Sequence, residues 1–382
     1  MKRCFFLLTV ITGLTCIGAI GQPKQSGYFL AKLGRDTIAV EEFSLNAREL
    51  HGTSVARSPK TTIREYSATF GSDGILTHFH ITYQRFGKPV FAERDYVYSN
   101  DSVHVTVRQD TLTTKYAVAA SDHPVPFFGD CFGGWQAAVQ HAIQSDNKKG
   151  FGILAGKQVF HYDVQGNSPG NVELQNPGGD FGPLHAVVGK DGLLEKFDMT
   201  ETTDKFIAER VSTIDVREMA KNFAERERSG NALGILSPQD SARATVNGAS
   251  IIIDYGRPAA RGRTIFGQVV PWNVVWRTGA NAATQLITDK DLSFGTTVVP
   301  AGTYSLFTLP SQDKWILIIN IQHGQWGTDY DQSKDFARVP LEIKHLDALT
   351  ERFTVGITSG GSGGVLHFTW EKTEASIPFK VQ

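Results

Sequence analysis

The sequence predicts an all-β protein of two modules, and three observations support this fold class. Short runs of β-branched and aromatic residues alternate with turn residues along most of the 382-residue chain. Clear helical spacing occurs in two segments alone. The length exceeds the size at which a single hydrophobic core stops growing, so two domains are expected.

The composition narrows the class of protein. Hydrophobic residues make up 41% of the chain, with 38 Gly and 24 Phe, which suits a globular, turn-rich protein rather than a disordered one. The formal net charge is −1, from 38 basic and 39 acidic residues. This balance predicts neither a nucleic-acid partner nor binding to an anionic membrane surface.

We expect the chain to divide into four segments. They are a signal peptide at 1–21, an N-terminal antiparallel β domain at 22–212, a linker helix and connector at 213–235, and a C-terminal β-sandwich domain at 236–382.

The first segment has the pattern of a secretory signal. Lys2 and Arg3 form a basic start, an apolar run follows from Phe5 to Ile20, and small residues precede the expected cleavage before Gln22. The run is too short, and too often broken by Thr and Gly, to span a membrane comfortably. The residues before Cys16 match a lipoprotein box poorly, so we expect no lipid anchor there. The sequence therefore predicts an exported protein, periplasmic or extracellular, with no transmembrane segment after cleavage.

Alternation over residues 28–116 predicts an antiparallel meander. Thr37–Phe43 and Thr62–Phe70 are two such runs, and Ser72-Asp-Gly74 makes a hairpin turn into Ile75–Tyr83. Further strands are expected at 97–99, 103–107, 158–164, 171–174, 185–188 and 206–211. About a dozen strands of this length form a curved sheet or partial barrel.

Two segments interrupt the β pattern. Gly133–Ala142 has apolar residues at helical spacing and predicts one helix inserted across the sheet. Asp215–Arg228 is the linker helix. Asp215 and Glu218 approximate a capping box, and Gly230 is a suitable terminator. The apolar face of the linker helix consists of Val216, Met219, Ala220, Phe223 and Ala224.

From Ala242 the alternation returns and continues to the end of the chain. Strands are expected at 250–255, 297–299, 303–309, 315–320, 352–357 and 365–370. About ten short strands at turn spacing of roughly 8–12 residues predict a β-sandwich or jelly-roll-like module.

Several motifs of this module occur in a characteristic order. They are Asp254-Tyr-Gly-Arg-Pro258, Gly262-Arg263, Ile265-Phe-Gly267, Val270-Pro-Trp272, Trp276-Arg-Thr-Gly-Ala-Asn281, Pro300-Ala-Gly-Thr-Tyr-Ser-Leu-Phe-Thr308 and Gly324-Gln-Trp-Gly-Thr328. With these motifs, the chain from 236 to 381 resembles the bacterial domain-of-unknown-function family 2911. The family pattern has an acidic residue where Ala282 stands, so any role of that carboxylate is absent here. The resemblance implies an exported all-β module and no established activity, and the N-terminal module resembles no family that we can name.

The block from Trp276 to Thr284 is the candidate ligand site. An indole stacks on the apolar face of a sugar, a guanidinium donates to hydroxyls, and an amide both donates and accepts. The alternative is structural, with the tryptophans in the core and Arg277 holding loop carbonyls. The candidate ligand-binding residues are Tyr255, Arg257, Trp276, Arg277, Asn281, Thr284 and Trp326.

Three other groups of residues have the spacing of a metal-binding or phosphate-binding site. His78 and His80 point to the same face of a strand, as two ligands of zinc or copper would, and His104 could be the third ligand. We favour the alternative, in which these histidines are exposed to solvent and bind no metal. The aspartates at 329, 331 and 335 approximate a calcium-loop spacing without its glycine or terminal Glu. The glycine-rich segment 359–364 precedes a strand, so it is a hairpin loop and not a phosphate cradle. We therefore predict no metal and no cofactor.

Cys131 is the single cysteine outside the signal segment, so no internal disulfide is expected. A nucleophile beside His123 or His141 is one interpretation. A small buried apolar residue is the one we favour, because no neighbouring Lys or Arg would stabilise a thiolate.

These observations lead to two functional expectations. The first is an exported, non-catalytic two-domain β protein that binds a carbohydrate or another small polar ligand, or that is associated with the cell envelope. The alternative is a secreted hydrolase whose carboxylates or histidines are brought together by the fold, since such pairs leave no local motif. The sequence identifies no protein partner and no catalytic residue.

Overall fold

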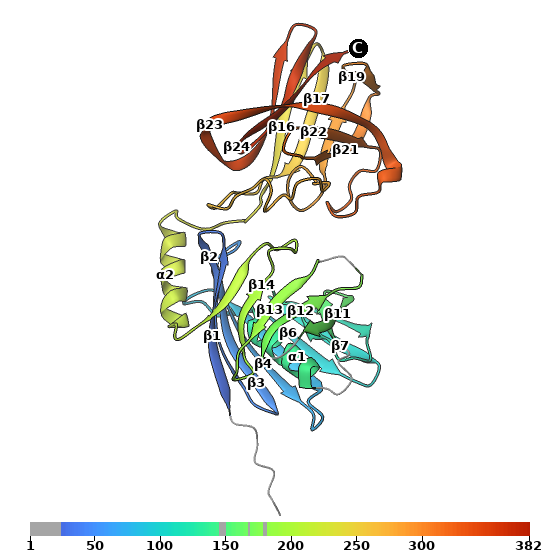
Figure 1. Ribbon diagram of the computed structural model, residues 1–382. Helices are drawn as coiled ribbons and strands as arrows, with labels where there is room; N and C mark the ends of the chain where they lie inside the picture. Colours follow the sequence, from blue (N-terminus) through green and yellow to red (C-terminus); the bar gives the residue numbers. More distant parts are fainter. Residues whose placement is uncertain (1–23, 145–149, 167–168, 179–181) are drawn as a thin grey trace, which may run out of the picture.

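The computed structural model describes residues 24–144, 150–166, 169–178 and 182–382, and these form two β modules joined by a connector (Figure 1). The expected signal peptide, residues 1–21, lies outside the described residues. The all-β class predicted from the sequence is confirmed.

The N-terminal module is a single fifteen-stranded sheet with the order β8-β7-β6-β5-β4-β3-β2-β1-β15-β14-β13-β12-β11-β10-β9. Its pairings are antiparallel except for the short parallel contact between β9 and β10. The strands are β1 (Gln25–Leu33), β2 (Asp36–Leu45), β3 (Glu49–Ala56), β4 (Thr62–Phe70), β5 (Leu76–Gln84), β6 (Val90–Tyr98), β7 (Ser102–Gln109), β8 (Leu112–Ala119), β9 (Val125–Pro126), β10 (Phe151–Ala155), β11 (Gln158–Gly166), β12 (Gly170–Gln175), β13 (Leu184–Val188), β14 (Leu194–Asp198) and β15 (Ile207–Val211).

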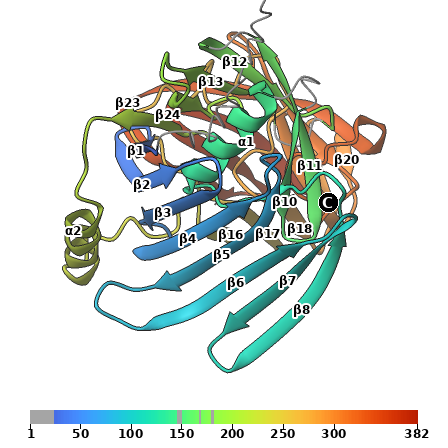
Figure 2. The same cartoon turned by 90° about the horizontal axis from the view of Figure 1, so that it is seen from below.

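This sheet curls until its two ends approach each other (Figure 2). The pairing of β1 with β15 joins two meanders into one surface. At the far end, the Tyr116 hydroxyl on β8 donates to the Gly156 carbonyl in the β10–β11 turn at 3.4 Å, and Lys157 Nζ lies 5.2 Å from the Tyr116 ring centroid. The predicted curved sheet or partial barrel is therefore confirmed.

Helix α1 (Phe132–Gln144) lies inside the curl, and the helix expected at 133–142 is confirmed. Most of its residues are buried because the sheet surrounds it, which explains why its apolar residues do not form a single stripe. Trp135 is 3% exposed, and its ring centroid lies 4.8 Å from that of Phe197 on β14.

Helix α2 (Val216–Arg228) packs on the outer face of the same sheet. Its buried residues Val216, Ala220 and Phe223 contact Val40, Val55 and Ile63 of β2, β3 and β4. The Asp215 carboxylate accepts from the Glu218 backbone N–H at 2.9 Å, so the predicted cap is present.

The C-terminal module is a nine-stranded sheet with the order β16-β17-β18-β21-β22-β23-β24-β19-β20. It encloses a second core that includes Phe353 and Trp370. The strands are β16 (Gln239–Val246), β17 (Ala249–Gly256), β18 (Thr284–Thr288), β19 (Leu292–Phe294), β20 (Thr297–Val299), β21 (Gly302–Leu309), β22 (Trp315–Asn320), β23 (Asp335–Gly360) and β24 (Gly363–Val381), with a 3-10 turn η1 (Gln332–Lys334).

The last hairpin of this module differs from the prediction of short strands. β23 has 26 residues and β24 has 19, and they include the runs expected at 352–357 and 365–370. The first part of β23 pairs with β22 and the rest pairs with β24. Register shifts between residues 345 and 354 interrupt the ladder, as bulges do where a strand bends from one layer to the next.

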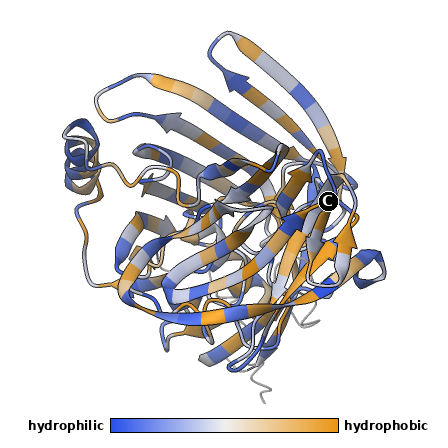
Figure 3. Ribbon diagram, turned by 90° about the horizontal axis from the view of Figure 1, so that it is seen from above, coloured by the Kyte–Doolittle hydropathy of each residue, from blue (hydrophilic) through white to orange (hydrophobic). Residues whose placement is uncertain are grey.

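Alternation of apolar and polar residues along the strands is visible in both modules (Figure 3). This is the period of two that carries one face of each strand into a core. Neither helix in the described part of the chain has the length and apolar character needed to cross a membrane.

The two modules meet at the β1–β2 turn. Arg261, whose side chain is 5% exposed, forms an ion pair with Asp36, and its carbonyl accepts from the Arg35 backbone N–H at 2.9 Å. Its own backbone N–H donates to Glu351 Oε1 at 2.9 Å. Glu351 also pairs with Arg35 at 3.3 Å, so both modules contribute to one network.

Candidate functional site

The Trp276–Thr284 segment forms a tight corner that leads into β18. Thr278 and Asn281 have positive φ angles of 52° and 64°. Trp276 Nε1 donates to the Gly279 carbonyl at 3.1 Å, and the fully buried Thr284 hydroxyl donates to the Thr278 carbonyl at 2.7 Å. The polar atoms of Trp276 and Thr284 are therefore bonded within the corner.

The rings of this region pack into the core of the C-terminal module. The centroid of Trp276 lies 5.9 Å from that of Trp370 and 5.2 Å from that of Phe353. Tyr255 is 3% exposed and packs edge-on against Phe353, with its hydroxyl 3.4 Å from Asp240 Oδ2. Trp276 and Tyr255 thus have structural contacts that occupy most of their surface.

Arg257 ties the end of β17 to β23. Its guanidinium donates to Asp240 at 3.2 Å, to the Phe353 carbonyl at 3.3 Å and to the Thr354 hydroxyl at 3.2 Å. These bonds account for each of its three nitrogens.

The remaining candidates, Arg277, Asn281 and Trp326, lie at the end of the module that faces the N-terminal sheet. Arg277 Nη1 donates to the Asn281 carbonyl at 3.0 Å, and the Asn281 amide donates to the Ser237 carbonyl at 3.0 Å. Gly327 packs against the Arg277 stem, and its neighbour Trp326 is 49% exposed. The structure therefore brings these three candidates together and leaves part of each accessible.

Lys205, from the N-terminal module, lies within the electrostatic reach of Arg277. Burial lowers the pKa of Lys205, and the charges of Arg277 and Arg263 lower it further. Burial also lowers the pKa of Arg263 and of Arg277. We call Lys205, Arg263 and Arg277 the interdomain cation cluster.

The charges of Glu201, Glu351 and Asp329 act on Lys205, Arg263 and Arg277 respectively and partly offset the lowering of their pKa values, but none of them forms a salt bridge with the cluster. Over the described ranges of the chain, no Asp or Glu oxygen lies within 4.0 Å of the charged nitrogens of Lys205, Arg263 or Arg277. Arg263 donates instead to the carbonyls of Ala259 at 2.8 Å and Ala260 at 3.0 Å. Within the described part of the chain, Nη1 is the one guanidinium nitrogen of Arg277 that donates a hydrogen bond to protein.

The histidines singled out in the sequence share a carboxylate instead of forming a set of three. On the outer face of the sheet, His78 Nε2 and His80 Nδ1 lie 2.7 Å and 3.3 Å from the same Asp95 oxygen. His104 contacts the Ser102 hydroxyl at 3.3 Å. Among the residues that the structure describes, no cluster of three His, Cys, Asp or Glu could hold a metal ion.

The aspartates of the calcium-like spacing form bonds within their loop. Asp331 accepts from the Ser333 backbone N–H at 2.9 Å. Asp335 accepts from the Asn320 amide at 2.9 Å and the Tyr330 hydroxyl at 2.7 Å.

A buried polar cluster beneath α1 was not identified from the sequence. Glu41 on β2 is 0% exposed and accepts from the Tyr66 hydroxyl, from the Phe132 N–H at 2.7 Å and from the Gly133 N–H at 3.2 Å. Burial is the main cause that raises its pKa to about 8. The carboxyl oxygens satisfy two of the free N–H groups at the start of α1. The signal was present in the alternation, because Glu41 shares strand parity with the core residue Phe43.

The neighbouring carboxylate, Asp130, accepts from Arg64 and from the Ser54 hydroxyl at 2.8 Å. Beside it, Cys131 is 4% exposed, and burial raises the pKa of its thiol well above the ordinary value. A buried thiol of raised pKa is a poor nucleophile at neutral pH. The charge of Asp130 adds to the rise in the pKa of Glu41, but both carboxyl groups are bonded to groups of the core.

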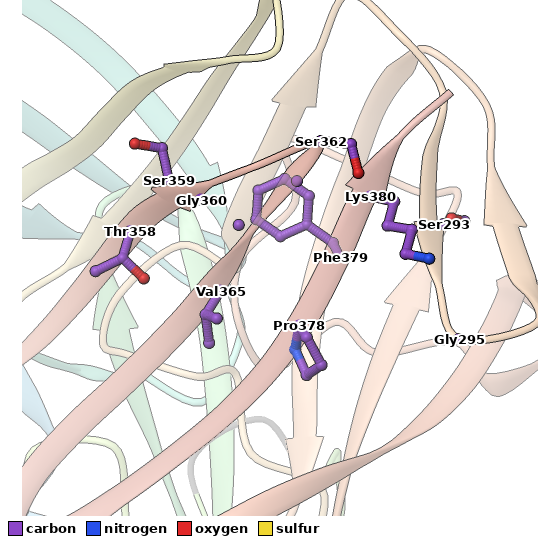
Figure 4. Close-up of a pocket in the computed structure, with 12 residues that line it drawn as sticks. Ser293, Gly295, Thr358, Ser359, Gly360, Ser362, Val365, Pro378, Phe379 and Lys380 are labelled. Carbon is purple, nitrogen blue, oxygen red and sulfur yellow. The ribbon is translucent and has the colours of Figure 1, made fainter.

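A surface depression at the end of the β23–β24 hairpin has a volume of about 480 Å³ (Figure 4). It includes the hydroxyls of Thr358, Ser359 and Ser362, the Phe379 ring and the Lys380 amine. The depression is therefore lined by a glycine-rich hairpin, and Lys380 is its one charged residue.

Comparison with known proteins finds a family match for the C-terminal module and none for the N-terminal module. No curated protein matches the chain. A solved structure from Nitrosomonas europaea, described as "a putative AttH", is 10% identical, with 94% of this chain and 92% of that chain covered and a TM-score of 0.13. A likeness at this TM-score carries no structural argument. No family model matches the residues before 237. Residues 237–379, which include the Trp276–Thr284 corner, match the family described as "Protein of unknown function (DUF2911)", so the resemblance inferred from the motifs of the C-terminal module is confirmed.

Proposed function

We propose that this protein is an exported, non-catalytic binding protein that holds a small anionic ligand, such as an acidic sugar, at the interdomain cation cluster. The observation that carries the proposal is the meeting of Lys205, Arg263 and Arg277 with no carboxylate in salt-bridge range among the described residues. Like charges that are partly withdrawn from water are unfavourable, and a bound anion offsets this cost.

The ligand class follows from the groups around the cluster. Arg277 offers a planar set of donors that suits a carboxylate, and Lys205 offers a point charge from the other module. Asn281 is exposed beside Arg277, and the half-exposed Trp326 provides an indole face for the apolar side of a sugar ring. This chemistry favours a carbohydrate acid over a neutral sugar.

The binding part of the proposal is tested with the full mature chain. Thermal shift and titration calorimetry would compare glucuronate with glucose, and sodium sulfate would serve as a plain anion. We expect glucuronate to stabilise the protein more than glucose does. The Arg277→Ala and Lys205→Ala variants should each reduce that effect at least fivefold, whereas Lys344→Ala, an exposed lysine outside the cluster, should not change it. Equal shifts in all four proteins would contradict the proposal.

The export part needs a separate measurement. The chain would be expressed with its first segment in a bacterium, and the N-terminal sequence of the product outside the cytoplasm would be determined. A mature protein that begins at Gln22 supports export, and an uncleaved chain confined to the cytoplasm contradicts it.

A further inference from the structure

The inner face of the N-terminal sheet carries a second group of cationic and aromatic residues. On neighbouring strands, Arg64 of β4 and Arg94 of β6 flank Tyr83 of β5, with guanidinium carbons 5.6 Å and 5.7 Å from its ring centroid. Arg94 also lies 5.9 Å from the ring centroid of Phe128, in the segment that leads into α1. Burial raises the pKa of the Tyr96 phenol, and the charge of Arg94 acts on it in the opposite direction. We call Arg64, Tyr83, Arg94, Tyr96 and Phe128 the arginine–aromatic patch.

The two arginines of the patch differ in their counterions. Arg64 forms an ion pair with Asp130, although its buried Nε has no hydrogen-bond partner among the residues that the structure describes. Arg94 is half-buried, and no carboxylate oxygen in the described part of the chain lies within 4.0 Å of its guanidinium. The aromatic rings stabilise its charge in part, but a guanidinium with five N–H donors retains capacity for an anion.

Beyond Arg94 the inner face continues toward the sheet edge as a strip that holds Ala92, Val107 and Leu112 together with the polar residues Gln109 and Thr114. The strand register places Val107 of β7 opposite Arg94 and Thr114 of β8 opposite Val107. The next row on the same face is Ala92 of β6, Gln109 of β7 and Leu112 of β8, and Leu112 is 73% exposed. In Figure 2 this part of β6–β8 extends away from α1. The strip from β6 to β8 spans about 10 Å.

We propose that the arginine–aromatic patch binds a monocarboxylate with an apolar chain, its carboxylate on Arg94 and its chain along Ala92, Val107, Leu112 and Thr114. The charge match fixes one end of the ligand, because a carboxylate is the planar anion that a guanidinium pairs with in two hydrogen bonds. The apolar residues of the strip fix the other end, since covering them removes apolar surface from water. This site is independent of the interdomain cation cluster and takes a different class of ligand.

The test uses octanoate as the probe and the full mature chain. Calorimetric titration would compare octanoate with acetate, which has the charge without the chain, and with octan-1-ol, which has the chain without the charge. We expect octanoate to bind at least tenfold more tightly than either. If acetate or octan-1-ol binds as tightly as octanoate, one of the two anchors is absent and the proposal is wrong.

Matched variants locate the site. Arg94→Gln should weaken octanoate binding at least tenfold, and Arg94→Lys should retain part of the affinity because the charge remains. Arg108→Gln is the control, since Arg108 lies on the outer face of β7 and pairs with Glu93 at 2.6 Å. Thr114→Trp, at an exposed position, should weaken octanoate by filling the strip while leaving Arg94 intact. Unchanged affinity in folded Arg94→Gln, or equal loss in Arg108→Gln, would overturn the assignment.

Discussion

Glu41 is an ionisable side chain in the core of the N-terminal module, where it bonds α1 to the sheet. It is fully buried, and three donors, from Tyr66, Phe132 and Gly133, converge on its carboxyl oxygens. These bonds favour the charged form, but burial outweighs them and raises the pKa to about 8. At neutral pH the native protein therefore holds a proton at this site that an unfolded chain releases.

This proton makes stability depend on pH, with a sign that can be worked out. Between the ordinary pKa of 4.5 and the folded pKa of about 8, the native state binds more protons than the unfolded state. The contribution is fully present below pH 4.5 and is lost as the pH rises through 8. We expect the free energy of unfolding to fall over this window with a slope of up to about 1.4 kcal/mol per pH unit.

Glu41→Gln tests this prediction, because glutamine keeps one acceptor oxygen, places an NH2 group where the second oxygen stood, and cannot ionise. Denaturant unfolding from pH 5 to pH 9 should show a shallower pH dependence in the variant than in the parent. Glu42→Gln, one position along the same strand on the other face, should keep the parental slope. Parallel curves for the parent and Glu41→Gln would rule out this role.

At the scale of elements, the local sequence pattern predicted the type of each element more reliably than it predicted the surfaces that the element contacts. Asp215–Arg228 was expected as a helix from its cap and its apolar face, and both features are present. The surface that receives it is the outer face of β2–β4, and no local signal shows that strands some 150 residues earlier would cover it. Long-range pairing and burial are set by the whole sheet, so the sequence alone could not reveal them.

The same limit applies to the candidate sites. The corner residues 276–284 were recognisable because they lie together in the sequence. By contrast, Lys205 joins Arg277 only through the fold, and Arg64, Tyr83 and Arg94 come from three separate strands. Strand parity constrains the faces of Arg64, Tyr83 and Arg94, but it does not show which faces meet or which remain open.

The cap of α2 gives a prediction at this scale. Replacing Asp215 by Ala removes the acceptor for the Glu218 N–H and should lower the free energy of unfolding by about 1 kcal/mol. Asp215→Asn retains an acceptor and should cost much less. Chemical denaturation measures both, and an equal loss in the two variants would show that the hydrogen bond is not the cause.

The start of α1 gives another prediction, because two adjacent glycines there differ in their surroundings. A Cβ on Gly133 would contact the Tyr66 hydroxyl and lie 3.0 Å from Phe43 Cβ, whereas a Cβ on Gly134 would lie 3.3 Å from a single methyl of Val125. Gly133→Ala should therefore destabilise the protein by about 1–3 kcal/mol through overpacking. Gly134→Ala should be near neutral, since alanine favours the helix by up to about 1 kcal/mol. Thermal and denaturant unfolding of both variants would test the contrast, and equal stabilities would contradict the close packing of α1 on the sheet.

For the whole molecule, the arrangement of the modules decides whether the interdomain cation cluster exists. Lys205 lies in the β14–β15 loop of the N-terminal module, and Arg263 and Arg277 lie between β17 and β18 of the C-terminal module, so the cluster depends on a fixed junction. Arg261 is the residue that most directly fixes it. Its nearly buried side chain pairs with Asp36, and its backbone bonds to Arg35 and Glu351.

Arg261→Ala should loosen this junction without unfolding either module. The loss of a nearly buried partner should cost about 2–3 kcal/mol, less than for a fully buried pair because the Asp36 side chain is 30% exposed. We expect calorimetric unfolding to separate into two transitions, and the glucuronate response to weaken because Lys205 and Arg277 are no longer held together. Arg35→Ala is the control, since its ion pair with Glu351 is exposed and should contribute less than about 1 kcal/mol. If Arg261→Ala behaves as Arg35→Ala does in both measurements, the modules are held by other contacts, and the cation cluster does not depend on this ion pair.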